Sequence, residues 1–355
     1  MKRRMANKVV IWVLMLVVLI SVMLPVYGAS SKYEKLNVGV MVSTMSIPVF
    51  YAQDKGWFKE AGLNVNVIIF PTGVPINEAI AAKQLDIACS GFAAIYSVAS
   101  GSCKWIAETN TTNGAGIYAR PDSPIVKEKG KVKGFPKILG SKETLRGVKI
   151  LGPLGTSAQF INDGYIAKFG LKETDVSQVH MEFGPAYQAF VSGQGDLLSV
   201  SPPYSYDCVA KGYVEVCSFE DATNVVVKDG CFARTEVIQK RRGEVKLFLK
   251  VLLRALNDLA DNPQMRFTYS MKKYHENAQE FTDRDLKNEI ADRQYIGTKF
   301  LKKKDYVFGE AMDPSAEFLV AHGKIRKEDL PNVVKGIDSS LISEVSGLKI
   351  KQYGK

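Results

Sequence analysis

The chain contains 355 residues, of which 46% are hydrophobic and 24% charged, and its formal net charge is +10. A chain of this length and apolar content can bury one large core or two medium ones, so it is long enough to fold without help from a partner or a cross-link. After the first 28 residues, no stretch of the sequence is long and apolar enough to span a bilayer.

Residues 1–28 have the pattern of a secretory signal peptide. Four basic residues precede an apolar run over residues 9–24, and small residues follow Pro25. The alternative is a retained membrane anchor, but the run is short for a bilayer span. No cysteine lies at the cleavage-like site, so a lipid anchor is not expected there. We expect cleavage and a mature protein that is periplasmic or extracellular.

A mature chain that starts after residue 28 loses four basic residues and no acidic one, so its net charge falls from +10 to +6. A mildly basic exported protein can favour anionic solutes or an anionic membrane surface. The same charge can equally serve solubility alone. Export argues against nucleic acid as a partner.

Cysteine and histidine residues give little sign of a metal or cofactor site. The five cysteines are Cys89, Cys103, Cys208, Cys217 and Cys231. An odd count leaves at least one thiol free, and export permits disulfides. Cys89 is expected to be a small core residue, and one pair among the last three could form. There is no C-x-x-C pair and the three histidines lie far apart, so neither a metal nor a cofactor is expected.

The elements after the signal peptide alternate between strands and helices. Residues 35–42 predict a buried strand, and Ser46 can cap a helix that starts at Ile47. Strands are expected over 65–70 and 85–89, with a short helix over 75–83 between them. This βαβαβ order implies right-handed crossovers and a parallel sheet.

A degenerate copy of this pattern follows about 110 positions later. It predicts strands over 148–151, 179–183 and 197–200, and helices over 158–169 and 186–191. Such an internal echo indicates two similar α/β lobes that face each other across a cleft, where small molecules bind. We expect the first lobe to comprise 31–118 plus 234–355, and the second to comprise 119–233.

The remaining segments complete this division. Residues 117–120 and 231–234 are expected to cross between the lobes, and both contain Ala-Arg after an aromatic residue. The Lys/Gly/Pro-rich segment 127–142 lacks periodicity and predicts an exposed loop. Residues 245–259 predict a strongly amphipathic helix.

Ligands of parallel α/β sheets bind beyond the carboxyl ends of the strands, at helix N-termini. The loops that this rule selects are rich in hydroxyls, glycine and backbone N–H groups. Their candidate binding residues are Ser43, Thr44, Ser46, Thr72, Gly73, Ser90, Gly91, Thr156, Ser157 and Tyr204. No acid, base and nucleophile cluster in these loops, so we expect recognition of a small polar or anionic group without catalytic residues.

Two features have competing interpretations. The Gly-Thr-Ser loop at Thr156 and Ser157 can bind a ligand at a helix N-terminus, or Thr156 can simply cap the helix. Asp86 and Asp196 could form a catalytic pair. Each follows a tight turn and precedes a strand, which favours a structural role in orienting that turn.

The residues also resemble a known family. Residues 53–63, with Gly56, Phe58 and Gly62, look like the "A-x-x-x-G-x-F-x-x-x-G-L" signature of nitrate/sulfonate/taurine-type ABC-transporter substrate-binding proteins. Phe-Pro-Thr-Gly at 70–73, the segments 79–88 and 145–150, and Gly-Gln-Gly-Asp at 193–196 with a later Pro-Tyr follow in that family's order. The resemblance covers residues 36–330.

This resemblance implies a two-lobe periplasmic-binding-protein fold, with a mostly parallel sheet flanked by helices in each lobe and the ligand cleft between them. It implies a monomer that captures a small, anionic or polar solute and delivers it to a membrane permease. Ser-Pro-Pro-Tyr at 201–204 and the insert at 127–142 depart from the family pattern and leave the solute open among nitrate, sulfonates, taurine, pyrimidines and aromatic acids. The alternatives are an enzyme on the same fold, related to pyrimidine-synthesis or dehydratase-like proteins, and a ligand-presenting partner of a membrane sensor.

Overall fold

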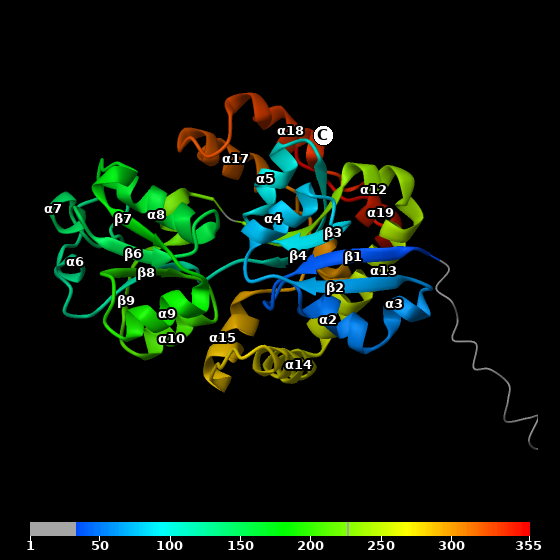
Figure 1. Ribbon diagram of the computed structural model, residues 1–355, viewed down its shortest axis with the longest axis horizontal. Coiled ribbons are helices and arrows are strands. Elements are labelled where there is room, and N and C mark those ends of the chain that lie inside the picture. The colour runs from blue at the N-terminus through cyan, green and yellow to red at the C-terminus, as the bar shows by residue number, and fades with distance from the viewer. Residues whose placement is uncertain (1–32, 226) are drawn as a thin grey trace, which may run out of the picture. The chain divides into compact units, whose positions relative to one another are not determined.

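A computed structural model describes residues 33–225 and 227–355, so the predicted signal peptide lies outside the described residues. These residues form two five-stranded sheets with the orders β2-β1-β3-β10-β4 and β7-β6-β8-β5-β9. Helices flank each sheet (Figure 1). We call the first sheet and its helices the first lobe, and the second sheet and its helices the second lobe. Within the described range, no helix has the length and hydropathy needed to cross a membrane.

The first lobe begins with the predicted βαβαβ unit. Its elements up to the first crossing are β1 (Lys35–Val40), α2 (Ile47–Asp54), α3 (Trp57–Glu60), β2 (Asn64–Ile69), α4 (Gly73–Ala81), β3 (Ile87–Ser90), α5 (Ala94–Ala99) and β4 (Cys103–Thr111). Strand β1 pairs in parallel with both β2 and β3, which confirms the predicted parallel unit.

The second lobe repeats that unit. Its elements are β5 (Gly116–Ala119), α6 (Pro124–Lys127), α7 (Lys142–Leu145), β6 (Lys149–Gly152), α8 (Ser157–Lys168), η1 (Glu173–Asp175), β7 (Ser177–His180), α9 (Phe183–Val191), β8 (Leu197–Val200), α10 (Tyr204–Ala210), β9 (Val214–Ser218) and α11 (Phe219–Thr223). Strand β6 pairs in parallel with β7 and β8, as β1 does with β2 and β3. Helix α9 starts earlier than predicted, because Pro185 is tolerated in a first turn.

The chain then returns to the first lobe and adds a helical region. Its elements are β10 (Lys228–Arg234), α12 (Thr235–Lys240), α13 (Arg242–Asp261), α14 (Pro263–Glu276), α15 (Asp283–Asp292), α16 (Thr298–Leu301), α17 (Met312–Ala321), η2 (Lys327–Asp329), α18 (Leu330–Gly336) and α19 (Ser340–Ser346). The predicted amphipathic helix is α13. Its apolar side chains, Phe248, Leu252 and Leu256 among them, are buried with those of β1 and α2, which fixes this helix to the first lobe.

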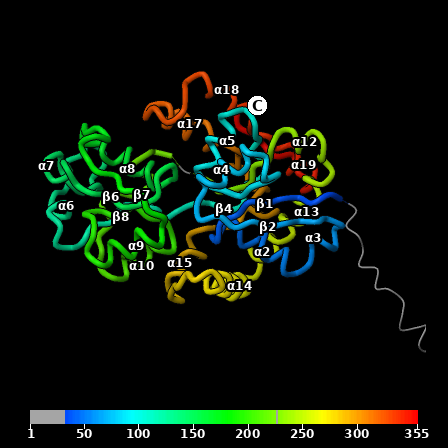
Figure 2. Tube along the Cα trace, viewed as in Figure 1, coloured from blue at the N-terminus to red at the C-terminus, as the bar shows by residue number. Residues whose placement is uncertain are grey.

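The lobe crossings lie earlier than predicted. The segments expected to cross belong to strands instead, because β5 pairs antiparallel with β8 and β9, and β10 pairs antiparallel with β3 and β4. The chain therefore crosses from β4 to the second lobe, a path that can be followed in Figure 2, and it returns between α11 and β10. Each sheet contains four parallel strands and one antiparallel strand supplied by a crossing, so both lobes share one topology.

The shared Ala-Arg sequence has the same structural role in both lobes. After β5, the Arg120 guanidinium donates hydrogen bonds to the carbonyl oxygens of Gly195, Phe190 and Gln194 at 2.8–2.9 Å. At the end of β10, the Nε of Arg234 donates to the Leu85 carbonyl oxygen at 2.8 Å. Each arginine thus holds the turn that precedes the third strand of its own lobe.

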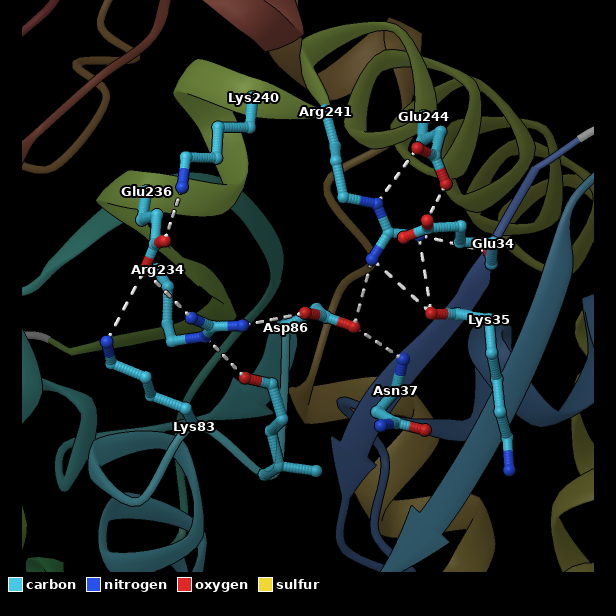
Figure 3. A network of polar contacts seen from close by, with 11 residues as sticks. Glu34, Lys35, Asn37, Lys83, Asp86, Arg234, Glu236, Lys240, Arg241 and Glu244 are labelled. Atoms are coloured by element: carbon cyan, nitrogen blue, oxygen red, sulfur yellow. Dashed lines mark hydrogen bonds and ion pairs between the residues drawn. The ribbon is translucent and has the colours of Figure 1, made fainter.

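Asp86 is the centre of a polar network on the first lobe (Figure 3). Its Oδ1 lies 2.9 Å from Arg234, and its Oδ2 lies 3.4 Å from Arg241. Oδ2 also accepts a hydrogen bond of 2.9 Å from the backbone N–H of Asn37. In the second lobe, Asp196 accepts a 2.7 Å hydrogen bond from the backbone N–H of Lys149. Both aspartates tie the start of a third strand to the backbone of the neighbouring first strand, which is a structural role, although the contact is with a strand and not with the predicted turn.

The segment 127–142 is largely exposed and lacks helix or strand over most of its length, as predicted. It is nevertheless anchored to the second lobe, because Val132, Ile138 and Leu139 are buried in that lobe's core. A bridge between Lys129 and Leu139 closes its base. The insert is therefore a tethered loop on the surface of the second lobe.

Cys89 and Cys231 face each other in the core of the first lobe. They are directly opposite on the antiparallel strands β3 and β10, their sulfur atoms are 2.7 Å apart, and both side chains are fully buried. The pairing considered among Cys208, Cys217 and Cys231 therefore does not include Cys231, because the other two belong to the second lobe. The register of β3 against β10 places Cys231 opposite Cys89, and this register cannot be read from the sequence.

We expect protein exported into an oxidising compartment to contain a Cys89–Cys231 disulfide, formed by thiol–disulfide exchange with the oxidoreductases of that compartment. A cross-link between distant positions should raise the free energy of unfolding by about 2–4 kcal/mol. Peptide mapping under non-reducing conditions would detect it, with Cys231→Ala as the negative control. A pair that joined Cys89 or Cys231 to any other cysteine would contradict the strand register.

Candidate functional site

A cavity of about 550 Å³ lies between the two sheets. Its wall includes residues at or within four positions of the carboxyl ends of all eight parallel strands, four from each lobe. Among them are Ser43 after β1, Thr72 after β2, Thr156 after β6 and Glu182 after β7. The carboxyl ends of both parallel units therefore point at one shared space, as expected for ligand sites in such sheets.

Most of the residues selected from the sequence line this cavity. They are Ser43, Thr72, Gly73, Ser90, Gly91, Thr156, Ser157 and Tyr204. The two others, Thr44 and Ser46, are not part of the cavity wall. The repeat places Ser46 where the second lobe has Thr156, but the two residues face different surroundings.

Thr44 and Ser46 belong to the interior of the first lobe. The Thr44 hydroxyl donates a hydrogen bond to the buried carboxylate of Glu289, and the Tyr295 hydroxyl donates to the Thr44 carbonyl oxygen at 3.1 Å. Ser46 is the N-cap residue of α2, as predicted, but its side chain makes no capping hydrogen bond. These contacts hold the loop after β1 against the helical region, and they correct the expectation that both residues face the ligand.

Thr156 and Ser157 of the Gly-Thr-Ser loop have different roles. The Thr156 Oγ1 accepts a hydrogen bond of 3.2 Å from the Ala158 N–H and donates one of 2.7 Å to the Pro153 carbonyl oxygen. Thr156 is therefore a helix N-cap. Ser157, the first residue of α8, is half-buried and lines the cavity. Ser157 is thus the better candidate for a ligand contact.

We expect Thr156→Ala to lower the free energy of unfolding by about 1 kcal/mol, because it removes the hydroxyl that caps α8. Ser157→Ala should leave that free energy nearly unchanged, since Ser157 is not the cap. Urea denaturation followed by circular dichroism measures both. Equal losses for the two variants would mean that Thr156 has no special capping role.

Glycine lets the backbone approach closely at Gly155, which directly precedes the wall residue Thr156, and at Gly91 of the cavity wall. Gly155 has a left-handed backbone (φ +74°), and a Cβ there would lie 2.6 Å from Val74 of the first lobe. A Cβ on Gly91 would lie 2.4 Å from the Asp229 Oδ1. The first glycine allows the loop before α8 to meet α4, and the second allows a carboxylate to sit beside the end of β3.

The charged side chains of the cavity were not predicted. They are Glu182, Glu215, Glu220, Asp229 and Arg293. Glu182 is the N-cap residue of α9, at the place where Thr72 precedes α4 in the first lobe. Alignment of the two repeats could have identified it. Asp229 and Arg293 come from β10 and the end of α15, so their presence depends on tertiary packing.

Asp229 and Arg293 form a buried pair. The Arg293 guanidinium lies 3.8 Å from the Asp229 Oδ2, which also accepts a 2.8 Å hydrogen bond from the Asn110 side chain. Burial raises the pKa of the Asp229 carboxyl, and the Arg293 charge opposes that rise. Burial also raises the pKa of the Glu215 carboxyl, which lies 3.4 Å from the Tyr118 hydroxyl.

Aromatic rings supply much of the apolar wall. The rings that line the cavity are those of Phe92, Phe183, Tyr204, Phe219 and Tyr274. Tyr204, predicted from its place after two prolines, lies 5.3 Å from the Tyr187 ring and 5.1 Å from the Phe281 ring. Its neighbour Tyr206 donates a 2.6 Å hydrogen bond to Asp292 of the first lobe. The cavity thus offers flat apolar faces beside its carboxylates.

A family model described as NMT1/THI5 like matches residues 43–265, more than half of the chain.

The chain belongs to the NMT1/THI5-like family.

Relatives of this NMT1/THI5-like chain are named as binding proteins. A candidate ABC transporter periplasmic binding protein of Brachyspira hyodysenteriae is 26% identical over 89% of this chain and 92% of its own length. A candidate aliphatic sulfonates-binding protein of Bacillus subtilis is 24% identical over 64% of this chain and 67% of its own.

Solved structures share the fold. The alkanesulfonate-binding protein SsuA from Xanthomonas axonopodis pv. citri, bound to MOPS, superposes with a TM-score of 0.66 at 16% identity, over 86% of this chain and 98% of its own. The periplasmic nitrate-binding protein NrtA from Synechocystis superposes with a TM-score of 0.69 at 13% identity, over 89% of each chain. The predicted two-lobe periplasmic-binding-protein fold is confirmed.

The cavity of this family member is lined by hydroxyls, carboxylates, a guanidinium group and aromatic rings. Among the described residues, no cysteine, histidine or lysine lines the cavity, and no group of three or more His, Cys, Asp or Glu side chains could hold a metal ion. Asp86 and Asp196, the carboxylate pair considered from the sequence, are not part of its wall. The arrangement suits recognition of a small organic molecule.

Proposed function

We propose that this protein is the extracytoplasmic solute-binding component of an ABC importer. In this proposal it acts as a monomer, binds one small polar organic solute between its lobes and delivers that solute, unchanged, to a membrane permease. The signal-peptide pattern of residues 1–28 and the names of the relatives support a location outside the cytoplasm.

One observation carries the proposal. Loops from the carboxyl ends of all eight parallel strands converge on a single cavity of about 550 Å³. Ligand sites of proteins typically have volumes of about 300–1,000 Å³ and combine apolar walls with a few polar groups. This cavity has that size and that mixture, so it suits a solute of several to a dozen or more non-hydrogen atoms.

Contacts between the lobes at the cavity rim suggest how binding could be transmitted. The Thr72 hydroxyl of the first lobe lies 3.5 Å from the Glu182 Oε1 of the second. A solute that touches both helix N-termini would favour arrangements in which the lobes approach. Since a ligand shifts a conformational equilibrium by its differential affinity for the two states, this would stabilise the closed form that a permease can recognise.

A thermal-shift screen of the purified protein tests the proposal. The panel would contain ethanesulfonate, taurine, nitrate, benzoate, benzamidine and cytosine. A solute at one hundred times its Kd stabilises the folded state by about 2.7 kcal/mol, which gives a clear rise in the melting temperature. At least one member should raise the melting temperature in a concentration-dependent way. A product that accumulates with time would favour an enzyme on this fold instead.

A further inference from the structure

The charges that line the cavity are unevenly balanced. Arg293 is the cationic side chain of the wall, and it already lies beside Asp229. Glu182, Glu215 and Glu220 remain. Within residues 33–225 and 227–355, no lysine, arginine or histidine forms an ion pair with any of these three carboxylates. Burial raises the pKa of Glu215 and so disfavours its charge, but Glu182 and Glu220 still give the cavity an excess of negative charge.

Glu182 is the most constrained of the three. Its Oε1 lies 3.5 Å from the Thr72 hydroxyl, whereas its Oε2 is buried and has no hydrogen-bond partner among the described residues. A buried carboxylate oxygen without a partner costs free energy, and a donor from a ligand would remove that cost. The missing partner is by its chemistry an N–H or O–H group.

Two serine hydroxyls of the same wall are also buried without a hydrogen-bond partner among the described residues. Ser90 is 1% exposed, and its hydroxyl has no partner among the described residues. The Ser43 hydroxyl is likewise buried without a partner. Both residues line the cavity. Together with Glu182 they leave polar atoms of both lobes available to one bound molecule.

The aromatic faces of the cavity suit the same type of molecule. Phe92, Phe183 and Tyr204 offer flat rings to the cavity that the carboxylates also line. A cationic group is attracted both to carboxylates and to aromatic faces, and an apolar or aromatic body packs against the rings. An oxyanion group is repelled by the carboxylates and by the negative faces of the rings.

Helix N-termini are the feature that could favour an anion, and three helices of eight or more residues, α4, α8 and α9, start at the cavity. At α9, however, the N-cap residue is Glu182, whose negative charge already lies at the positive end of that helix. At α8, the Thr156 hydroxyl accepts a hydrogen bond from the backbone N–H of Ala158. These side chains reduce what α8 and α9 can offer to an anionic ligand, whereas α4 has no side-chain cap.

We infer that the solute carries a positively charged nitrogen group with N–H donors, such as an amidine, guanidine or amine, on an apolar or aromatic body. This inference rests on the proposed function and departs from the anionic solute expected from the sequence. Glu182 would accept hydrogen bonds from the nitrogen group, with Ser90 as a further polar contact. The aromatic rings would hold the body of the solute.

Calorimetric titration with benzamidine and benzoate tests the inference. These probes share a phenyl ring and a planar substituent, but benzamidine is a cation with N–H donors and benzoate is an anion with acceptors. We expect benzamidine to bind at least tenfold more tightly. Tighter binding of benzoate would overturn the inference and leave the proposed function standing. Binding of neither probe would also overturn the inference. The thermal-shift screen would then test the proposed function separately.

A pair of variants tests the role assigned to Glu182. Glu182→Gln keeps the size of the side chain and removes its charge, so benzamidine affinity should fall at least tenfold. Glu143→Gln makes the same chemical change on an exposed carboxylate of the second lobe that does not line the cavity, and the affinity should stay unchanged. Retained affinity in Glu182→Gln, with normal melting of both variants, would overturn the assignment.

Discussion

Asp86→Ala is expected to lower the free energy of unfolding by about 3 kcal/mol, because it removes the carboxylate on which two arginines converge. Asp86 lies 2.9 Å from Arg234 and 3.4 Å from Arg241, and all three side chains are largely buried. Without it, two guanidinium groups lose a buried partner. The Asn37 N–H also loses its 2.9 Å hydrogen bond.

Glu236→Ala is the matched control for this network (Figure 3). Glu236 pairs with Lys240 at 2.8 Å and with Arg234 at 3.4 Å, but its side chain is 45% exposed. Exposed ion pairs contribute little to stability, so its removal should hardly change the urea midpoint. If Asp86→Ala and Glu236→Ala lowered the midpoint equally, the buried network would not have the stabilising role assigned to it.

Ser157→Trp is expected to weaken the binding of a cavity solute at least tenfold while the protein stays folded. Ser157 is the first residue of α8 and lines the cavity, so an indole there would occupy part of the 550 Å³. The neighbouring Thr156 keeps the helix cap. A first-turn position is therefore a place where bulk can be added without loss of a capping hydrogen bond.

The control for this variant is Ser157→Ala, which removes the hydroxyl without filling space. Calorimetric titration of a solute that stabilises the wild-type protein would compare the two. A strong effect of tryptophan with a weak effect of alanine indicates occupancy of the cavity. Undiminished affinity in Ser157→Trp would mean that the solute binds elsewhere.

Local pattern was sufficient to predict much of the scaffold. Alternating apolar residues and glycine turns predicted the βαβαβ units, and β8 was predicted with its observed bounds. The crossings were misplaced because Ile117 and Cys231 have apolar neighbours that suit either a linker or a strand. Pairing with strands that are distant in the sequence determines whether such a segment is a linker or a strand, and local sequence does not reveal that pairing.

Some residues of the candidate site could likewise be predicted from local sequence, and others could not. Ser90, Ser157 and Tyr204 could be predicted because each follows or opens an element at the carboxyl end of a strand. Asp229 and Arg293 could not, since they reach the cavity from β10 and from beyond α15, which lie far from those loops in sequence. The buried Asp229–Arg293 pair of the cavity wall thus depended on long-range packing.

The central claim is that one solute binds reversibly in the cavity between the lobes. Calorimetric titration of the wild-type protein, followed by mass spectrometry of the recovered solute, tests it most directly. We predict one equivalent bound per chain and a solute that is recovered unchanged. A solute that is consumed, or a complete panel of anionic, neutral and cationic solutes that gives no binding, would contradict the account.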